Sequence, residues 1–307
     1  MDILNGEQWH IHEGDCIPHM AQDMPPESID CAVFSPPFPS LYAYTSEACD
    51  IGNTATVDAE ARVHLSFFYN ALRRVLKPGR VAVVHVCQIP RMKRAGEVGM
   101  YDFRGLNIRL GERAGLVYEY DWAVRKNPQS QAIRTRSREL QFAGLESDRA
   151  RQRGCIPDYL VKFRAPGDNA IPIDADGQVS RNQWIDWAEG TWDDIIETDT
   201  LNTAAAKGDD DTRHICPLQL EVIRRLVLLF SNPGEIVFSP FAGIGSEGYV
   251  ALGGVSPKTR KRVDDPRRFY GCEIKPEYIA QARKNLASVE TQNASTRSLF
   301  DLQEAAP

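Results

Sequence analysis

The tetrapeptide Ser35-Pro36-Pro37-Phe38 constrains this chain most, because it directly follows the apolar run Ile29-Asp30-Cys31-Ala32-Val33-Phe34. Such a run predicts a buried strand of a parallel sheet. Two prolines end the strand and fix the backbone at its carboxyl end, where open α/β sheets bind ligands. Proline has no N–H, so the turn presents carbonyl oxygens, a serine hydroxyl and an aromatic ring. This surface suits an exocyclic amine, whose hydrogens need acceptors and whose base can stack on the ring.

Strands and helices alternate along much of the remaining chain. We expect further strands at 9–12, 80–87, 116–125, 158–164, 235–238 and 268–273, and helices at 59–76, 104–114, 217–230, 246–252 and 276–286. This alternation predicts an α/β fold built on a parallel sheet. A loop at 39–58, rich in Ser, Thr, Tyr and Gly, follows the tetrapeptide and can close over a ligand.

The charges are unevenly distributed, although the net charge of −6 does not by itself indicate a nucleic-acid binder. Residues 125–164 carry ten Lys and Arg against four acids, whereas residues 165–211 carry twelve acids against two bases. A basic block of this kind can form a positive face on an acidic protein, and a solvated charged surface is the alternative. Periodicity weakens from about 126 to 211, which predicts an inserted, loop-rich region.

Composition also limits the class of protein. No stretch approaches the ~20 consecutive apolar residues of a membrane span, and the amino terminus has no basic-then-apolar signal pattern. Seven cysteines are scattered and never spaced CxxC. We therefore expect a cytoplasmic protein with reduced thiols, without a disulfide framework, zinc cluster or other metal site.

A second candidate site follows the predicted strand 235–238 and reads SPFAGIGSEG, from Ser239 to Gly248. Its glycines satisfy GxGxxG, a spacing that lets the backbone approach a ligand before a helix begins. Glu273 ends the next strand, where an acid can accept hydrogen bonds from ribose hydroxyls. These features predict nucleoside binding without identifying the nucleoside. A nicotinamide-dependent dehydrogenase would explain them too, but it gives Ser35-Pro36-Pro37-Phe38 no task.

Together these segments resemble the amino-methylating DNA methyltransferases. The first tetrapeptide resembles their target-base motif, (Asp/Asn/Ser)-Pro-Pro-(Tyr/Phe/Trp), and SPFAGIGSEG resembles their cofactor motif, Asp-Pro-Phe-x-Gly-x-Gly-Thr. The segment from Glu273 to Arg283, the segment 214–219 and the pair Gly14-Asp15 resemble three further family segments. The base motif precedes the cofactor motif, which is the family's β arrangement. The resemblance spans about 1–125 and 212–287.

The resemblance implies a Rossmann-like S-adenosylmethionine methyltransferase fold, with a mostly parallel twisted sheet and circularly ordered motifs. It implies a catalytic core of 1–125 and 212–290, a target-recognition region at 126–211 and a flexible tail at 291–307. The implied cofactor is S-adenosylmethionine and the implied partner is double-stranded DNA. A cognate restriction enzyme is a further possible partner, and the chain is expected to be a monomer or homodimer.

Site residues follow from the motif matches. The implied catalytic residues are Ser35, Pro36, Pro37 and Phe38. The implied cofactor-binding residues are Asp15, His214, Pro217, Phe241, Gly243, Gly245 and Glu273. Arg134, Arg136 and Arg138 alternate, so an extended segment would project them to one side toward DNA phosphates, and an exposed solvated loop is the alternative. For Trp184, Trp187 and Trp192, anchoring in the core is favoured over stacking at DNA.

The implied reaction is methyl transfer to the exocyclic amine of a base flipped out of the duplex. Ser35 Oγ and the Pro36 carbonyl would accept the amine hydrogens and turn its lone pair toward the methyl group, and Phe38 would stack on the base. In the family, Ser at the first motif position usually accompanies cytosine N4, so cytosine N4 is favoured and adenine N6 is the alternative. Methylation at cytosine C5 needs a Pro-Cys loop, which this chain lacks.

Two positions depart from the family pattern. Ser239 stands where Asp is usual, and Ser246 stands where Thr is usual. Loss of the Asp carboxylate weakens an expected contact near the methionine amine of the cofactor. A non-catalytic DNA-binding relative is therefore a further alternative.

Overall fold

One eight-stranded sheet organises the chain in the computed structural model, which describes residues 2–39, 43–54, 57–91, 99–135, 137–173, 178–201 and 218–304. Across the sheet the strands are β1 (Trp9–Glu13), β10 (Arg268–Glu273), β9 (Ile236–Ser239), β2 (Ile29–Phe34), β3 (Leu76–Cys87), β7 (Asp158–Arg164), β6 (Val117–Val124) and β8 (Thr191–Trp192). The first five are parallel to one another, and β7 runs antiparallel to its neighbours β3 and β6. A separate two-stranded sheet pairs β4 (Ile89–Pro90) with β5 (Met100–Tyr101). The predicted α/β fold with a mostly parallel sheet is confirmed.

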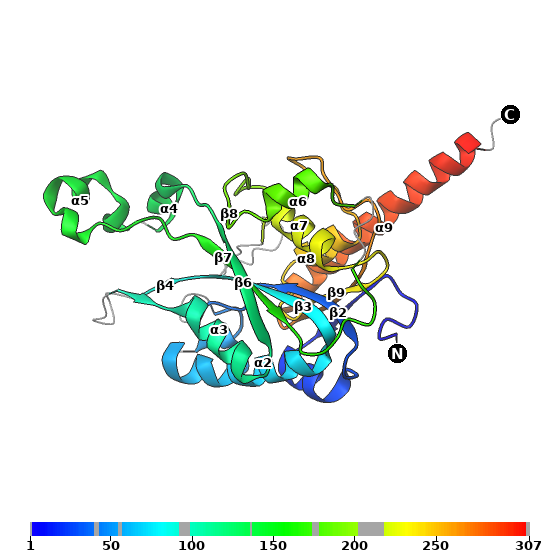
Figure 1. The fold of residues 1–307 in the computed structure, drawn as a ribbon, viewed down its shortest axis with the longest axis horizontal. Coiled ribbons are helices and arrows are strands. Elements are labelled where there is room, and N and C mark those ends of the chain that lie inside the picture. The colour runs from blue at the N-terminus through cyan, green and yellow to red at the C-terminus, as the bar shows by residue number, and fades with distance from the viewer. Residues whose placement is uncertain are drawn as a thin grey trace.

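Helices cover both faces of the sheet (Figure 1). One face carries α1 (Cys16–Pro18), α2 (Arg62–Val75) and α3 (Phe103–Arg113), and the other carries α6 (Arg181–Trp187), α7 (Leu220–Phe230) and α8 (Ser246–Ala251). Because both faces are covered, every residue of β2 is buried. Ala32 and Phe34 belong to the hydrophobic cluster with α2, whereas Cys31 and Val33 belong to the cluster with α7. The continuous apolar run of the sequence thus reflects a strand buried on two sides.

The strand order reverses between β9 and β2. From β2 the chain proceeds to β3, whereas from β9 it proceeds to β10 in the opposite direction, with β1 beyond. β2 and β9 are parallel neighbours, and Ala32 lies opposite Phe238. An early strand and a late strand therefore meet at a topological switch point, where open α/β sheets form a crevice outside their carboxyl ends.

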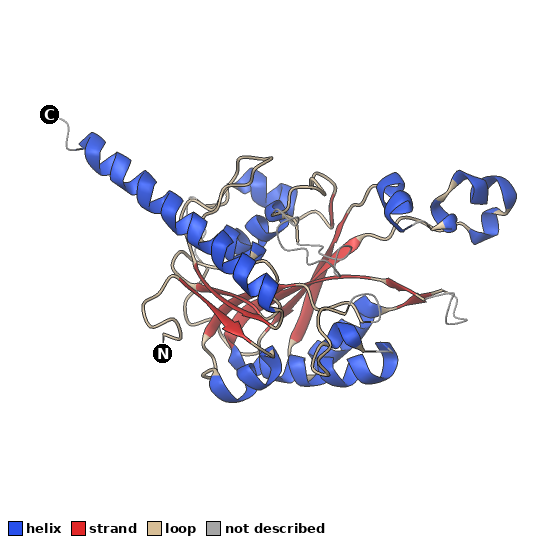
Figure 2. Cartoon of the chain, turned by 180° about the vertical axis from the view of Figure 1, so that it is seen from behind, coloured by secondary structure: helices blue, strands red, loops and turns tan. Residues whose placement is uncertain are grey.

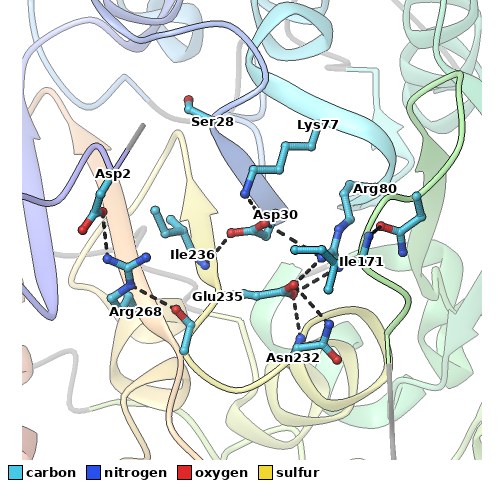
Figure 3. Close-up of polar contacts among 12 residues, drawn as sticks. Asp2, Ser28, Asp30, Lys77, Arg80, Ile171, Asn232, Glu235, Ile236 and Arg268 are labelled. Carbon is cyan, nitrogen blue, oxygen red and sulfur yellow. Dashed lines mark hydrogen bonds and ion pairs between the residues drawn. The ribbon is translucent and has the colours of Figure 1, made fainter. Parts of the chain in front are cut away.

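At the opposite edge, charged side chains connect the amino ends of β2, β3 and β9 (Figure 3). Asp30 accepts a hydrogen bond from the Ile236 backbone N–H at 2.9 Å and pairs with Lys77 Nζ at 2.5 Å. Arg80 is only 2% exposed and donates to Glu235 Oε2 at 3.1 Å. These groups, which we call the amino-edge network, hold β9 against strands from the first part of the chain.

Between β6 and β7 the chain leaves the body of the molecule as an arm, defined here as residues 126–157 (Figures 1 and 2). The arm contains α4 (Pro128–Thr135), η5 (Arg138–Leu140), α5 (Phe142–Ser147) and η6 (Arg149–Arg151). The extended segment predicted for residues 134–138 is wrong, because Arg134 lies in α4 and Arg138 begins η5. Arg136 lies outside the described residues. Local helical turns replace the strand-like alternation that the arginine spacing suggested.

The carboxyl-terminal helix and the inserted region differ in part from expectation. The helix predicted to end at Leu286 continues as α9 (Pro276–Glu304), beyond the point where a frayed tail was expected. The loop-rich region 126–211 contains the strand predicted at 158–164, which is β7, and also β8, which was not predicted. The prediction of buried tryptophans is confirmed for Trp187 and Trp192 and wrong for Trp184, which is 60% exposed. No described helix combines the length and apolarity needed to cross a membrane.

Candidate active site

A pocket with about 1050 Å³ of empty space opens at the switch point, outside the carboxyl ends of β1, β2, β9 and β10. Eight of the predicted site residues line it: Asp15, Ser35, Pro36, Pro37, Phe38, Phe241, Gly243 and Glu273. These residues come from four loops that are far apart in the sequence. They converge because parallel strands deliver their carboxyl ends to one edge of the sheet.

The other predicted cofactor-binding residues are His214, Pro217 and Gly245, and Gly245 does not line the pocket. His214 and Pro217 lie outside the described residues. Gly245 precedes α8 with a φ of +82°, and a Cβ added there would lie 3.2 Å from the Cβ of Ala282. Its backbone conformation and its close approach to α9 both favour glycine, so Gly245 shapes the loop from behind the pocket.

Ser35 is held by its neighbour on β3. Its hydroxyl lies 3.0 Å from His85 Nδ1 and 3.2 Å from the His85 carbonyl oxygen. Further along the same turn, the ring of Phe38 packs against Phe103 with centroids 5.7 Å apart. The turn therefore presents a hydroxyl and an aromatic ring that are both fixed by contacts outside the turn.

Phe241 anchors the glycine-rich loop while lining the pocket. Its ring centroid lies 5.0 Å from that of Phe68 and 6.0 Å from that of Phe34. The alternative of core packing is thus correct in part, because one side of the ring joins the hydrophobic core. The other side belongs to the pocket wall.

Glu273 fastens the glycine-rich loop to the end of β10. Its carboxylate accepts hydrogen bonds from the backbone N–H groups of Gly243 at 2.7 Å and of Ile274 and Lys275 at 2.9 Å. Burial raises the pKa of Glu273, and these N–H groups act in the opposite direction. A carboxylate offers about four acceptor positions. One position therefore remains for a hydroxyl of a ligand in the pocket.

Asp15 and Asp50 shape the opposite wall. Asp15 caps α1, its Oδ1 accepting from the Ile17 N–H at 2.9 Å, and burial raises its pKa. Asp50 is buried and accepts from the N–H groups of Tyr44 and Thr45, each at 2.7 Å. The loop predicted to close over a ligand thus has a defined shape in its described part, and Tyr44 and Asp50 line the pocket.

Glu247 is a charged residue of this pocket that sequence reasoning missed. It lies in the first turn of α8, is 5% exposed, and burial raises its pKa to about 8. The adjacent Ser246 also lines the pocket, and among the described residues its buried hydroxyl has no hydrogen-bond partner. Ser239 is fully buried and does not line the pocket. An acid directly after a glycine-rich loop was the signal available in the sequence.

Comparison with known proteins agrees with this geometry. A family model described as DNA methylase, of the N6/N4 class, matches residues 29–284, which is most of the chain. Type II methyltransferase M.BglII of Bacillus subtilis is 31% identical over 96 residues, 31% of this chain and 24% of that protein. DNA adenine methyltransferase YhdJ of Escherichia coli K12 is 37% identical over 65 residues, 21% of this chain and 18% of that protein. The matched segments thus span a quarter or less of these relatives.

Solved structures share the fold over a much larger part of the chain. TTHA0409 of Thermus thermophilus, a candidate DNA modification methylase solved with S-adenosyl-L-methionine, has a TM-score of 0.66 at 21% identity, covering 91% of this chain and 93% of that one. The cytosine-N4-specific PvuII DNA methyltransferase has a TM-score of 0.63 at 18% identity, covering 91% and 86%. The extent of the family match decides the assignment: this chain belongs to the DNA methylase family of N6 and N4 amino-methyltransferases.

Proposed function

We propose that this chain transfers the methyl group of S-adenosylmethionine to the exocyclic amine of a base flipped out of duplex DNA, with cytosine N4 as the favoured target. One observation carries the proposal. The turn that suits an amine, at Ser35, and the loop that suits a nucleoside, at Gly243, line the same pocket. A dehydrogenase would have no use for the first of these two walls.

The pocket fits the cofactor in its hydrogen-bonding groups. The remaining acceptor position of Glu273 suits a ribose hydroxyl, and the Asp15 carboxylate suits the adenine amine. At the other end, the hydroxyl of Ser246, which has no partner within the described part of the chain, suits the methionine carboxylate. When bound, S-adenosylmethionine supplies an electrophilic methyl group on a sulfonium. The residues of this chain hold and orient it.

Glu247 supplies the carboxyl group that the family usually has as Asp at the position of Ser239. Ser239 does not reach the pocket, whereas Glu247 lines it, with no ion pair to a Lys or Arg in the described part of the chain. A buried carboxyl without a cation suits the ammonium of the methionine end. This substitution argues against the inactive, DNA-binding relative that Ser239 made conceivable.

The wall formed by Ser35, Pro36 and Phe38 acts by orienting the target amine. An aromatic amine is a weak nucleophile because its lone pair is delocalised into the ring. Acceptors at Ser35 Oγ and the Pro36 carbonyl direct the two amine hydrogens, and the lone pair then points toward the methyl group. Holding the reacting atoms in line supplies much of the rate acceleration. The half-buried ring of Phe38 stacks on the base and stabilises it outside the duplex.

Cytosine N4 is favoured over adenine N6 because Ser35 opens the base motif. Two of the similar proteins differ on this point, since YhdJ is an adenine methyltransferase and the PvuII enzyme is specific for cytosine N4. Both bases present the same amine geometry to the wall. The choice between them therefore depends on the space around the ring as well as on Ser35.

The arm is our candidate for target recognition, as part of the region 126–211. It carries seven Lys and Arg against three acids, and Arg149 and Arg151 are exposed on it. It leaves and rejoins the sheet at the edge where the pocket opens, since Val124 lies opposite Asp158 at the carboxyl end of β3. Duplex DNA bound along the arm would have a base within reach of the pocket.

The direct test measures tritium transfer from labelled S-adenosylmethionine to duplex DNA of varied sequence. Hydrolysis of the product to nucleosides and mass spectrometry then identify the modified base. We expect N4-methylcytosine, and N6-methyladenine would support the alternative target. Calorimetric titration should give binding of S-adenosylmethionine and none of NAD. If the chain binds S-adenosylmethionine but transfers no methyl group, the proposed enzymatic activity is refuted and a non-catalytic DNA-binding relative is favoured.

A further inference from the structure

A row of polar side chains leads away from Ser35 across four neighbouring strands. Ser35 follows β2, His85 lies on β3, Asp158 begins β7, and Lys126 follows β6. The row exists because β7 is antiparallel: its first residue lies opposite Cys87, at the carboxyl end of β3. Asp158 is thereby placed at the end of the sheet where the pocket opens, although its strand runs in the opposite direction.

The contacts along the row are short and shielded from water. His85 Nδ1 lies 3.0 Å from Ser35 Oγ, and His85 Nε2 lies 2.9 Å from Asp158 Oδ2, close but not aligned as a linear hydrogen bond. Lys126 Nζ lies 2.5 Å from the same oxygen. The side chains of Lys126, His85 and Asp158 are 7%, 11% and 14% exposed.

Asp158 is a carboxylate at neutral pH. Burial opposes its ionisation, but His85 and Lys126 lower its pKa to about 2. A carboxylate beside Nε2 repels a nitrogen lone pair and attracts an N–H, so the proton of neutral His85 resides on Nε2. Nδ1 is then an acceptor, and the hydrogen of the Ser35 hydroxyl points to it.

Protonation of His85 does not change the outcome at Ser35. In that state Nδ1–H donates to Ser35 Oγ, and the hydroxyl hydrogen points to the His85 carbonyl oxygen at 3.2 Å. In both states the single hydrogen of the hydroxyl is engaged by His85. At least one oxygen lone pair remains for the pocket.

We infer that His85, oriented by Asp158 and Lys126, is a positioning residue that makes the Ser35 hydroxyl a pure hydrogen-bond acceptor toward the target amine. An unrestrained serine can donate as well as accept, and a donating hydroxyl would turn the amine lone pair toward itself and away from the methyl group. His85 thus gives serine the acceptor character that a carboxamide or carboxylate oxygen has intrinsically. This inference rests on the proposed function and goes beyond it, because nothing in the family motif names His85.

The test is steady-state methyl transfer by single and double variants of the full chain. His85→Ala should lower kcat by about 10- to 100-fold, the cost of misorienting a reacting group. The dissociation constant for S-adenosylmethionine should stay within about twofold, since His85 is not part of the pocket wall. His85→Asn keeps an acceptor near the position of Nδ1 and should recover most of the lost rate.

A double-mutant cycle separates positioning from a structural role. In a Ser35→Ala background, His85→Ala should cause no further loss of kcat, because the hydroxyl it orients is already absent. Asp158→Asn should lower kcat by a smaller factor than His85→Ala. Asp121→Asn is the matched control: Asp121 is an ion-paired carboxylate of β6, bonded to Arg104 Nε at 2.9 Å and not a member of the row.

The outcomes distinguish the two proposals. If the unaltered chain transfers no methyl group, the proposed function fails and the inference fails with it. If the unaltered chain is active and His85→Ala keeps its kcat, only the inference is refuted. Multiplying losses in the double variant, or equal losses in His85→Ala and His85→Asn, would also refute it. If His85→Ala does not fold, His85→Asn and Asp158→Asn still carry the test.

Discussion

The amino edge of the central sheet and the pocket at its carboxyl edge use charged residues in opposite ways. At the amino edge, Asp30 and Glu235 are matched by Lys77, Arg80 and a backbone N–H, so each charge has a partner (Figure 3). At the carboxyl edge, the pocket contains buried carboxyl groups at Glu247 and Glu273 that form no ion pair with a Lys or Arg of the described residues. The difference follows from the parallel strands, which give one sheet two chemically distinct edges.

Within a single strand, the residues at one end stabilise the fold and the residues at the other end serve the proposed function. β2 has Ser28 and Asp30 at its beginning and Ser35 directly after its end. Saturated hydrogen bonding at the beginning fixes the sheet, whereas the groups after its end keep hydrogen-bonding capacity for ligands. Substitutions at the two ends should therefore have different effects.

The largest expected effect is at the amino edge. Arg80→Met removes the buried cation that faces Glu235 and Asp30, and the uncompensated charge should lower the free energy of unfolding by about 3–5 kcal/mol. Urea denaturation measures this change. Arg109→Met removes an ion pair with Asp102 on the exposed surface, so its free energy of unfolding should change by no more than about 0.5 kcal/mol. Equal losses in the two variants would contradict the distinction.

The next effect is at the carboxyl edge. Ser35→Ala should lower kcat for methyl transfer about 100- to 1000-fold, because an acceptor for the reacting amine is lost. Its free energy of unfolding should change by less than about 1 kcal/mol. Ser28→Ala, at the other end of β2, removes a hydrogen bond to the Pro25 carbonyl and should cost about 1 kcal/mol of stability with kcat unchanged. A loss of kcat in Ser28→Ala would contradict the claim that the two ends of β2 have different roles.

A third prediction concerns the pH dependence of stability. The pKa of Glu247 is about 8 in the folded protein against 4.5 for an ordinary Glu, so the folded state holds the proton more tightly. Its stabilising contribution is complete below pH 4.5 and is lost as the pH rises toward 8. Between about pH 6 and pH 7.5 the free energy of unfolding should fall by about 2 kcal/mol, at about 1.4 kcal/mol per pH unit.

Glu247→Gln should abolish this decline and be more stable than the unaltered chain near pH 7.5. Denaturation curves at the two pH values give the comparison. The exposed Glu277, in the first turn of α9, provides the control, because Glu277→Gln leaves the buried carboxyl intact. If the free energy of unfolding still declines between the two pH values in Glu247→Gln, another group causes the decline.

The smallest effect is expected on the arm. Arg149→Gln should weaken DNA binding and reduce the slope of log Kd against log salt concentration by about 1, as for one lost phosphate contact. Binding of S-adenosylmethionine should not change. Arg62→Gln, on the exposed side of α2, should leave the slope unaltered. Equal slopes for the two variants would exclude Arg149 from the DNA interface.

Much of the fold could be predicted from local patterns. The bounds of β2, β7 and β10 agree with the sequence prediction, because each is a short apolar or alternating run between clear breaks. The shared pocket of Ser35 and Gly243 was also predictable, since both follow strands of one parallel sheet. The strand bounds depend on residues that are neighbours in sequence, and the shared pocket follows from the parallel sheet that these strands form.

The rest depends on pairings that local patterns do not contain. Nothing in the run 158–164 indicates that it pairs antiparallel with β3, and that pairing alone brings Asp158 to His85. The pKa of Glu247 depends on burial by several distant segments. The alternating arginines at 134–138 suggested an extended segment, but local helical turns at Arg134 and Arg138 prevailed.

The pairing of β2 with β9 also determines when the pocket can form while the chain is being synthesised. Asp30 receives its hydrogen bond from Ile236, 206 residues later in the chain. A nascent chain therefore exposes one unpaired edge of β2 until β9 has left the ribosome, and a contact of such long range forms slowly. Truncated chains lack the second wall of the pocket. The proposed active site can therefore form only after the segment from Ile236 to Gly243 has been synthesised.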